Sequence, residues 1–164
     1  MTKRTYRTFT HHEAVLRICC DAFEAVTEEI VRQRRVLEDY ILRHAAFGAS
    51  FEPVELLPDA PEVAQRMARA AWSVGVGPMA AVAGAIAEHV GRDLLSRTEQ
   101  VIVENGGDVF VRTRQPVLMG IYAGSSPLSR HIGLRVGGGG TPVGVCTSSG
   151  TIGHSLILGA ADAV

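Results

Sequence analysis

The sequence predicts an α+β fold, in which helices cover one face of an antiparallel sheet. Apolar residues recur at helical spacing mostly before residue 100, whereas short runs of β-branched residues lie mostly after it. Helices and strands therefore do not alternate as they do in a doubly wound parallel sheet. The chain has 164 residues, of which 46% are hydrophobic, so we expect one domain over residues 1–164 with a single core and no second domain.

The first 60 residues predict a strand, a long helix and a connection. Residues 2–10 are polar and basic, and we expect them to be loosely held. Residues 14–20 predict a short buried strand, and residues 24–44 an amphipathic helix with early glutamates and later arginines, as the helix dipole favours. Residues 47–58 are expected to form a surface connection, after which Asp59 is predicted to cap the next helix.

A stretch of small side chains follows, from Trp72 to Gly91. Gly75 and Gly77 are expected to end one helix, and Pro78 to begin the next. A helix built of alanine and glycine allows another backbone or a flat ligand to approach closely. Its N-terminal amides are one candidate for binding phosphate, although burial against the sheet is the preferred interpretation for most of its length.

Residues 101–111 predict a strand, a tight turn and a second strand. The turn consists of Glu104, Asn105, Gly106, Gly107 and Asp108. Asn105-Gly106 alone is enough to reverse the chain, because both residues tolerate positive φ. The second glycine and the two flanking acids exceed that need, so we interpret the turn as a candidate ligand site, with an unliganded turn as the alternative.

The remaining sequence predicts strands at 117–123, 131–136 and 143–146, with the four glycines of 137–140 as a hairpin loop. Residues 147–154 are the second candidate site. This segment is Thr147, Ser148, Ser149, Gly150, Thr151, Ile152, Gly153 and His154. Hydroxyls and free backbone amides suit phosphate or ribityl oxygens, and an ordinary Ser/Gly loop is the alternative.

A hydrolase triad, a zinc site and a reactive cysteine have weaker support in the sequence. A Ser-His-Asp hydrolase built from Ser148 or Ser149, His154 and Asp108 lacks a Gly-x-Ser-x-Gly elbow. The histidines do not fall at metal-ligand spacing with cysteines or acids, which disfavours a structural zinc site. Cys146 has no basic neighbour in sequence, so we expect a small packed thiol.

Charge and composition exclude further classes of function. Sixteen basic and seventeen acidic residues give a net charge of −1, so we expect no nucleic-acid binding. No apolar run reaches the roughly 20 residues of a membrane span, so we expect no membrane association. The three cysteines form no Cys-x-x-Cys pair, which favours a cytoplasmic protein.

Five motifs, at 75–87, 103–108, 121–127, 146–155 and 159–164, occur in an order that resembles the ApbE-like superfamily, and specifically an uncharacterised compact branch of it. Its transferase members are FAD:protein FMN transferases, which split FAD at the pyrophosphate with a divalent metal and attach FMN to a threonine of a target protein. For this chain the resemblance implies Mg²⁺ as the metal. The resemblance implies an ApbE-like (T-fold-like) domain that binds FAD or FMN. It implies that the flavin nucleotide contacts Gly77, Glu104, Asn105, Gly106, Gly107, Asp108, Thr147, Ser148, Ser149, Gly150 and Thr151. It also implies catalytic roles for Asp108 and His154.

The sequence departs from the transferases at three places. Pro78-Met79 stands where the transferases have Lys-Gly, and small apolar residues replace the acid that follows. The transferases also continue beyond the position of Val164 to a stretch that supplies metal ligands, so we expect that this chain either lacks the C-terminal segment of that fold or has an incomplete metal site. Two hypotheses follow: an FMN-transferring or FAD-cleaving enzyme with a protein acceptor, or a non-catalytic module that binds a nucleotide or forms a homo-oligomer.

Overall fold

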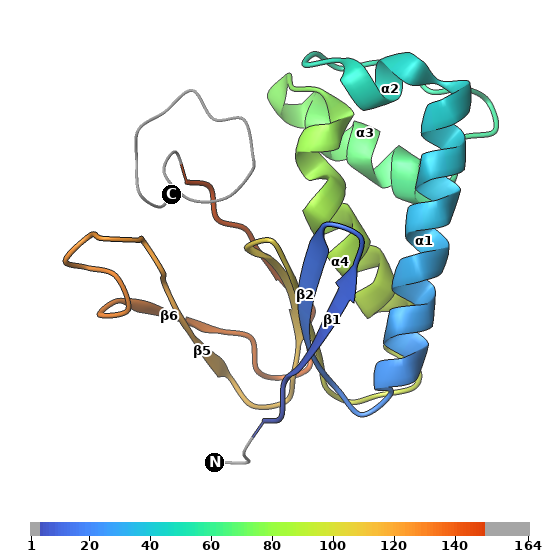
Figure 1. Cartoon of the computed structure of the whole chain (residues 1–164). Coiled ribbons are helices and arrows are strands. Elements are labelled where there is room, and N and C mark those ends of the chain that lie inside the picture. Colours follow the sequence, from blue (N-terminus) through green and yellow to red (C-terminus); the bar gives the residue numbers. More distant parts are fainter. Residues whose placement is uncertain (1–3, 150–164) are drawn as a thin grey trace.

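The computed structural model describes residues 4–149. Figure 1 shows helices against one face of a five-stranded antiparallel sheet and a two-stranded ribbon on the opposite side, which confirms the predicted α+β class. The elements in chain order are β1 (Arg7–His11), β2 (Ala14–Cys20), α1 (Phe23–Arg43), α2 (Ala45–Ala49), α3 (Glu62–Val74), the 3₁₀ helix η1 (Pro78–Ala81), α4 (Val82–Asp93), β3 (Val101–Asn105), β4 (Asp108–Arg112), β5 (Val117–Gly120), β6 (Gly133–Val136) and β7 (Val143–Val145).

The main sheet has the strand order β1-β2-β3-β4-β7, and every pairing is antiparallel. Strands β2 and β3 are neighbours although the whole helical segment separates them in the sequence. Ile18 pairs with Val103 in this register. The long β2–β3 connection therefore places all the helices on one face of the sheet (Figure 1).

Alternating side chains divide the core between the two faces of the sheet, as the period of two in a strand requires. Ile18, Val101 and Val103 face the helices and pack in one cluster with buried residues of α1, α3 and α4. Ile102 and Val111 face the opposite way and pack against β5 and β6 in a second, smaller cluster. The ribbon thus covers part of the face that the helices leave open.

Four local predictions need correction. The segment expected to be loose contains β1, which pairs with β2 along its whole length. An edge strand tolerates polar and charged residues, which is why its composition suggested a loose segment. The 137–140 glycines do not close a hairpin, because β6 pairs with β5 and β7 pairs with β4. They link the two sheets, where Gly139 and Gly140 donate backbone hydrogen bonds to residues just after β4.

The other two corrections concern the helices. The predicted connection contains α2, whose Phe47 is fully buried. Helix α3 begins at Glu62 after Pro61, and no side chain caps it. Asp59 instead forms an ion pair with Arg43 of α1. Within residues 4–149, no single helix is long and apolar enough to cross a membrane. The segments Glu62–Val74 and Pro78–Asp93 reach that length and hydropathy only when they are counted together, and the chain bends by 108° between them.

Gly91 places the backbone of α4 directly against a side chain of the sheet. A Cβ at this position would lie 2.1 Å from Cδ1 of Phe110, a buried residue of β4. The aromatic ring occupies the space that any other side chain would fill. Gly91 is therefore required where α4 packs against β4.

We predict that Gly91→Ala destabilises the domain by about 1–3 kcal/mol, because overpacking at Phe110 outweighs the gain in helix propensity. Urea unfolding followed by circular dichroism measures the change. The matched control is Gly120→Ala in β5, where a Cβ would meet open space, and it should change the unfolding free energy by less than about 0.5 kcal/mol. Equal stability of Gly91→Ala and the unmodified chain would contradict this packing.

Candidate functional site

The predicted turn joins β3 to β4 as a two-residue hairpin. Gly106 and Gly107 have φ values of 61° and 99°, a region that favours glycine, whereas Asn105 is the last residue of β3 and pairs with Asp108. The two turn residues are therefore Gly106 and Gly107 and not the expected Asn105-Gly106, and the second glycine is needed to reverse the chain. The Glu104 carboxylate accepts a hydrogen bond from the Gly107 amide, 3.1 Å away. Glu104 therefore braces the turn, which is a structural reason for the first of the two acids.

The turn also holds the N-terminus of α4. The Asn105 side-chain amide donates to the Ala83 carbonyl at 3.1 Å, and the Asp108 carboxylate accepts a hydrogen bond from the Gly84 amide. A Cβ on Gly84 would lie 3.3 Å from Oδ2 of Asp108, so the glycine leaves room for the acid. Since α4 has no side-chain cap of its own, Asp108 takes that role from another element.

The second predicted site lies directly beside this turn. The Thr147 hydroxyl donates to the Gly107 carbonyl at 3.4 Å, and a Cβ on Gly107 would lie 2.9 Å from the same hydroxyl oxygen. Thr147 and Ser148 are exposed, and Ser149 is half-buried. Gly150, Thr151 and His154 lie outside the described residues. Two segments 40 residues apart in sequence thus form one surface at the N-terminus of α4.

Cys146 also belongs to this surface, which corrects its prediction as a packed thiol. It is exposed, and its thiol hydrogen-bonds the Asp108 carboxylate. Partial burial of the sulfur, together with the negative charge and hydrogen bond of Asp108, raises the pKa of Cys146 to about 11. Burial also raises the pKa of Asp108, although the hydrogen bonds from Cys146 and Gly84 oppose that effect. The thiol therefore stays protonated and weakly nucleophilic at neutral pH.

Gly77 has a packing role that explains its identity. A Cβ there would lie 1.9 Å from the Ser50 carbonyl oxygen, so only glycine permits this contact. Nearby, the Val76 and Ala80 amides donate to the carbonyls of Ala71 and Gly77. These backbone donors are therefore engaged within the chain. The described contacts of Gly77 connect it to Ser50 and Ala80 and not to the turn.

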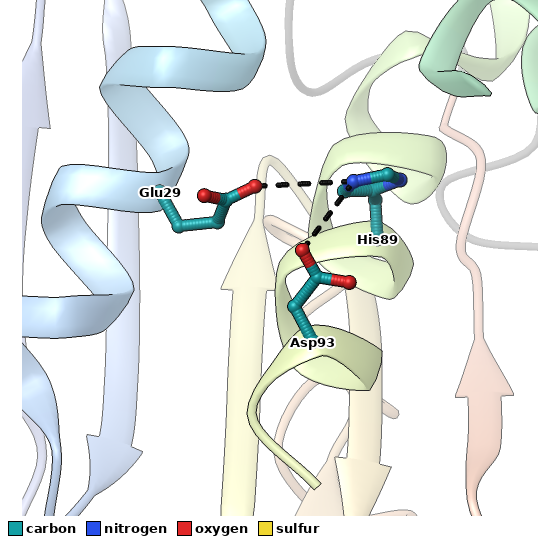
Figure 2. Close-up of side chains that lie close together, drawn as sticks. All are labelled: Glu29, His89 and Asp93. Carbon is teal, nitrogen blue, oxygen red and sulfur yellow. Dashed lines mark ion pairs between the residues drawn. The ribbon is translucent and has the colours of Figure 1, made fainter. Parts of the chain in front are cut away.

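The structure also brings together three side chains that the sequence did not connect. Figure 2 shows His89 of α4 between Glu29 of α1 and Asp93, one helical turn further along α4. This corrects the expectation that no histidine has an acid at metal-ligand spacing. The four-residue separation of His89 and Asp93 was the available signal. Glu29 could not be linked to them without knowing how α1 packs on α4.

We predict that Asp108→Asn accelerates alkylation of Cys146 by iodoacetamide at pH 8, because it removes the negative charge and acceptor that raise the thiol pKa. In the unmodified chain the rate should rise roughly tenfold per pH unit up to the pKa of about 11. Peptide mass spectrometry separates Cys146 from the other two cysteines. Glu104→Gln removes a charge from the same turn without touching the thiol and should leave the rate unchanged, whereas an unchanged rate in Asp108→Asn would contradict the contact.

Comparison with known proteins places this chain in a family. A family model described as AbpE bacteria matches residues 2–164. A UPF0280 protein of Methanococcus aeolicus is 44% identical over 138 residues, which cover 82% of this chain and 56% of the relative. A UPF0280 protein of Methanospirillum hungatei is 42% identical over 166 residues, which cover 96% and 67%.

A third relative has a similar identity and covers a similar share of the chain. A UPF0280 protein of Methanococcus vannielii is 39% identical over 148 residues, covering 87% of this chain and 59% of the relative. The chain spans between 56% and 67% of the length of these three relatives. Because the family model matches the chain from residue 2 to residue 164, the protein belongs to the family described as AbpE bacteria.

Proposed function

We propose that the surface formed by the 104–108 turn, residues 146–149 and the N-terminus of α4 binds a flavin nucleotide, FAD or FMN. The observation that carries this proposal is the contact between Gly107 and Thr147. Each segment has a sequence that suits a ligand site on its own, and the two segments lie against each other in the fold. Convergence of two such segments favours a shared ligand over two unrelated loops.

The chemistry of the surface suits the parts of a flavin nucleotide. Gly106 is exposed with open space around it, so a flat ring can approach the backbone there. Asp108 is partly buried, and its carboxyl group can hold a ribityl hydroxyl or a ring N–H. The exposed Ser148 hydroxyl can donate to phosphate or ribityl oxygens, and the exposed Thr147 hydroxyl, whose proton goes to the Gly107 carbonyl, can accept a hydrogen bond from a ribityl hydroxyl.

The resemblance to FAD:protein FMN transferases extends this proposal to chemistry. In that extension the hydroxyl of a threonine in an acceptor protein would attack the FMN phosphate of FAD, and AMP would leave as the pyrophosphate bond breaks. Asp108 would hold the ribityl group or the ring, and His154 would support the attacking or leaving oxygen. Mg²⁺ would accompany the phosphates. Within residues 4–149, however, the one group of three suitable metal ligands is Glu29, His89 and Asp93, and none of them belongs to the turn. The described residues therefore do not assemble a Mg²⁺ site beside Asp108, and we assign the metal no step.

We predict saturable binding of FMN and FAD to the purified chain, measured by quenching of flavin fluorescence. Thr147→Val keeps the shape of the side chain and removes its hydroxyl, so it should weaken binding roughly tenfold, the equivalent of one hydrogen bond. Thr10→Val, an exposed threonine of β1, is the matched control and should bind like the unmodified chain. Absence of saturable binding, or equal affinity of the two variants, would contradict the proposed site.

A second candidate function, an oligomer-forming module, is favoured by the β5–β6 ribbon and its connecting loop. Large apolar side chains are exposed there, including Leu118 at 76%, Leu128 at 58% and Ile132 at 45%. Exposed apolar groups gathered in one region commonly mark a protein interface. We propose that a second copy of the chain covers this region.

This second candidate predicts a concentration-dependent dimer in multi-angle light scattering. Leu118→Lys should shift the population to monomer, because it places a charge at the interface. Leu42→Lys, which changes an equally exposed leucine on α1, is the matched control and should leave the dimer intact. A monomer at all concentrations, or equal dimerisation of both variants, would refute the interface.

A further inference from the structure

We propose that Glu29, His89 and Asp93 form a binding site for a divalent transition-metal ion of the Zn²⁺ class. The site would join α1 to the C-terminal half of α4 (Figure 2). It is separate from the proposed flavin surface, which lies at the opposite end of α4. The proposal therefore goes beyond the flavin function and does not depend on it.

The geometry of the three donors suits one ion. Nε2 of His89 lies 3.6 Å from Oδ2 of Asp93 and 3.8 Å from Oε1 of Glu29, and all three donor atoms lie within 4.8 Å of one another. Zn²⁺ binds nitrogen and oxygen at about 2.0–2.2 Å, so its ligands lie roughly 3–4 Å apart. The Asp93 side chain is 48% exposed and can adjust its rotamer to complete the site.

The burial of the His89 side chain and its lack of hydrogen bonds within residues 4–149 are the independent observation that points to a ligand. The side chain is 6% exposed, and Figure 2 shows its Nε2 directed at the two carboxylates. Nδ1 is buried without a hydrogen-bond partner in the described part of the chain. The distances from Nε2 to both carboxylates exceed a hydrogen bond. A metal ion between the carboxylates would supply the partner that Nε2 lacks among the described residues, whereas Nδ1 would keep its present surroundings.

The surroundings favour a cation and give it access. Two carboxylates lie beside the His89 imidazole, and Arg32 and Gln33 donate hydrogen bonds that hold the Glu29 carboxylate in place. Asp93 is the last residue of α4, where the helix dipole favours positive charge. Glu29 and Asp93 line a surface cavity of about 350 Å³ together with Arg32, so the two carboxylates can be reached from solvent.

Arg32 is the competitor for this position. Its guanidinium donates to both oxygens of Glu29, at 2.7 and 2.5 Å, and lies 4.0 Å from Asp93. The arginine side chain is 59% exposed, so it can swing away when a metal binds. Gln33 is buried and also donates to Glu29, which keeps that carboxylate in place. Removal of the Arg32 charge should therefore strengthen metal binding.

The donor set distinguishes between classes of metal. One imidazole and two carboxylates suit Zn²⁺, Co²⁺ or Ni²⁺, whereas Mg²⁺ and Ca²⁺ prefer oxygen donors alone. Because the site links two helices, binding should also stabilise the folded chain. This provides a readout that requires no enzymatic activity.

The test is a calorimetric titration of the metal-free chain with Zn²⁺, paired with thermal unfolding. We expect one equivalent of Zn²⁺ to bind and to raise the Tm, and Mg²⁺ to do neither. Asp93→Asn should weaken Zn²⁺ binding at least about tenfold, and Arg32→Gln should tighten it. Glu88→Gln makes the same change of charge on α4 outside the cluster and should match the unmodified chain.

The chain also has three cysteines, which could bind the metal in place of the proposed ligands. The absorption spectrum of bound Co²⁺ distinguishes thiolate ligands from imidazole and carboxylate ligands. Bound Co²⁺ should show visible d–d absorption without the near-ultraviolet band of a cobalt–thiolate bond, and His89→Gln should abolish that spectrum. No stoichiometric binding by the unmodified chain would overturn the proposal. A thiolate band would also overturn it, as would equal Zn²⁺ affinity in Asp93→Asn and Glu88→Gln.

Discussion

The packing of α4 on the β3–β4 hairpin is the constraint on which the rest of the structure depends. Gly91 lets the helix approach Phe110 closely, and at the other end of the helix Asn105 and Asp108 bind the backbone of its first turn. A helix of small residues has little side-chain surface to fix its position. Polar contacts at its N-terminus and close packing near its C-terminus supply that fixation together.

This arrangement determines what each end of α4 can do. At the N-terminus, the turn that caps the helix also contacts Thr147 and Cys146, so a structural cap and a candidate ligand surface share Asp108. At the C-terminus, the approach of α1 places Glu29 opposite His89 and Asp93. The two surfaces have different chemistry, with glycine and hydroxyl groups at one and imidazole and carboxylates at the other.

The sequence predicts much of this fold because several elements have strong local patterns. The 101–111 hairpin, the strand at 14–20 and the long first helix are each found where the residues indicate them. Strand β1 was missed because its residues are polar, and its order comes from pairing with β2. The role of Asp59 was also missed, since the nearby Arg43 competes for its carboxylate.

The candidate site could be predicted only as separate segments. Glycines and hydroxyls marked the turn and residues 147–154, but their contact depends on β7 pairing with β4, which no local pattern reveals. The same limit explains Cys146, whose pKa depends on a carboxylate 38 positions earlier in the chain. The Glu29–His89–Asp93 cluster depends on helix packing in the same way. Long-range pairing, and not residue type, was the missing information.

The central claim is that the 104–108 turn and residues 146–149 form one ligand surface at the N-terminus of α4. Hydrogen–deuterium exchange with and without saturating FMN tests it most directly, because it reports each segment separately. The account predicts slower exchange in both segments and in the first turn of α4, with no change in α3. Protection of only one segment, or protection confined to other parts of the chain, would contradict the claim.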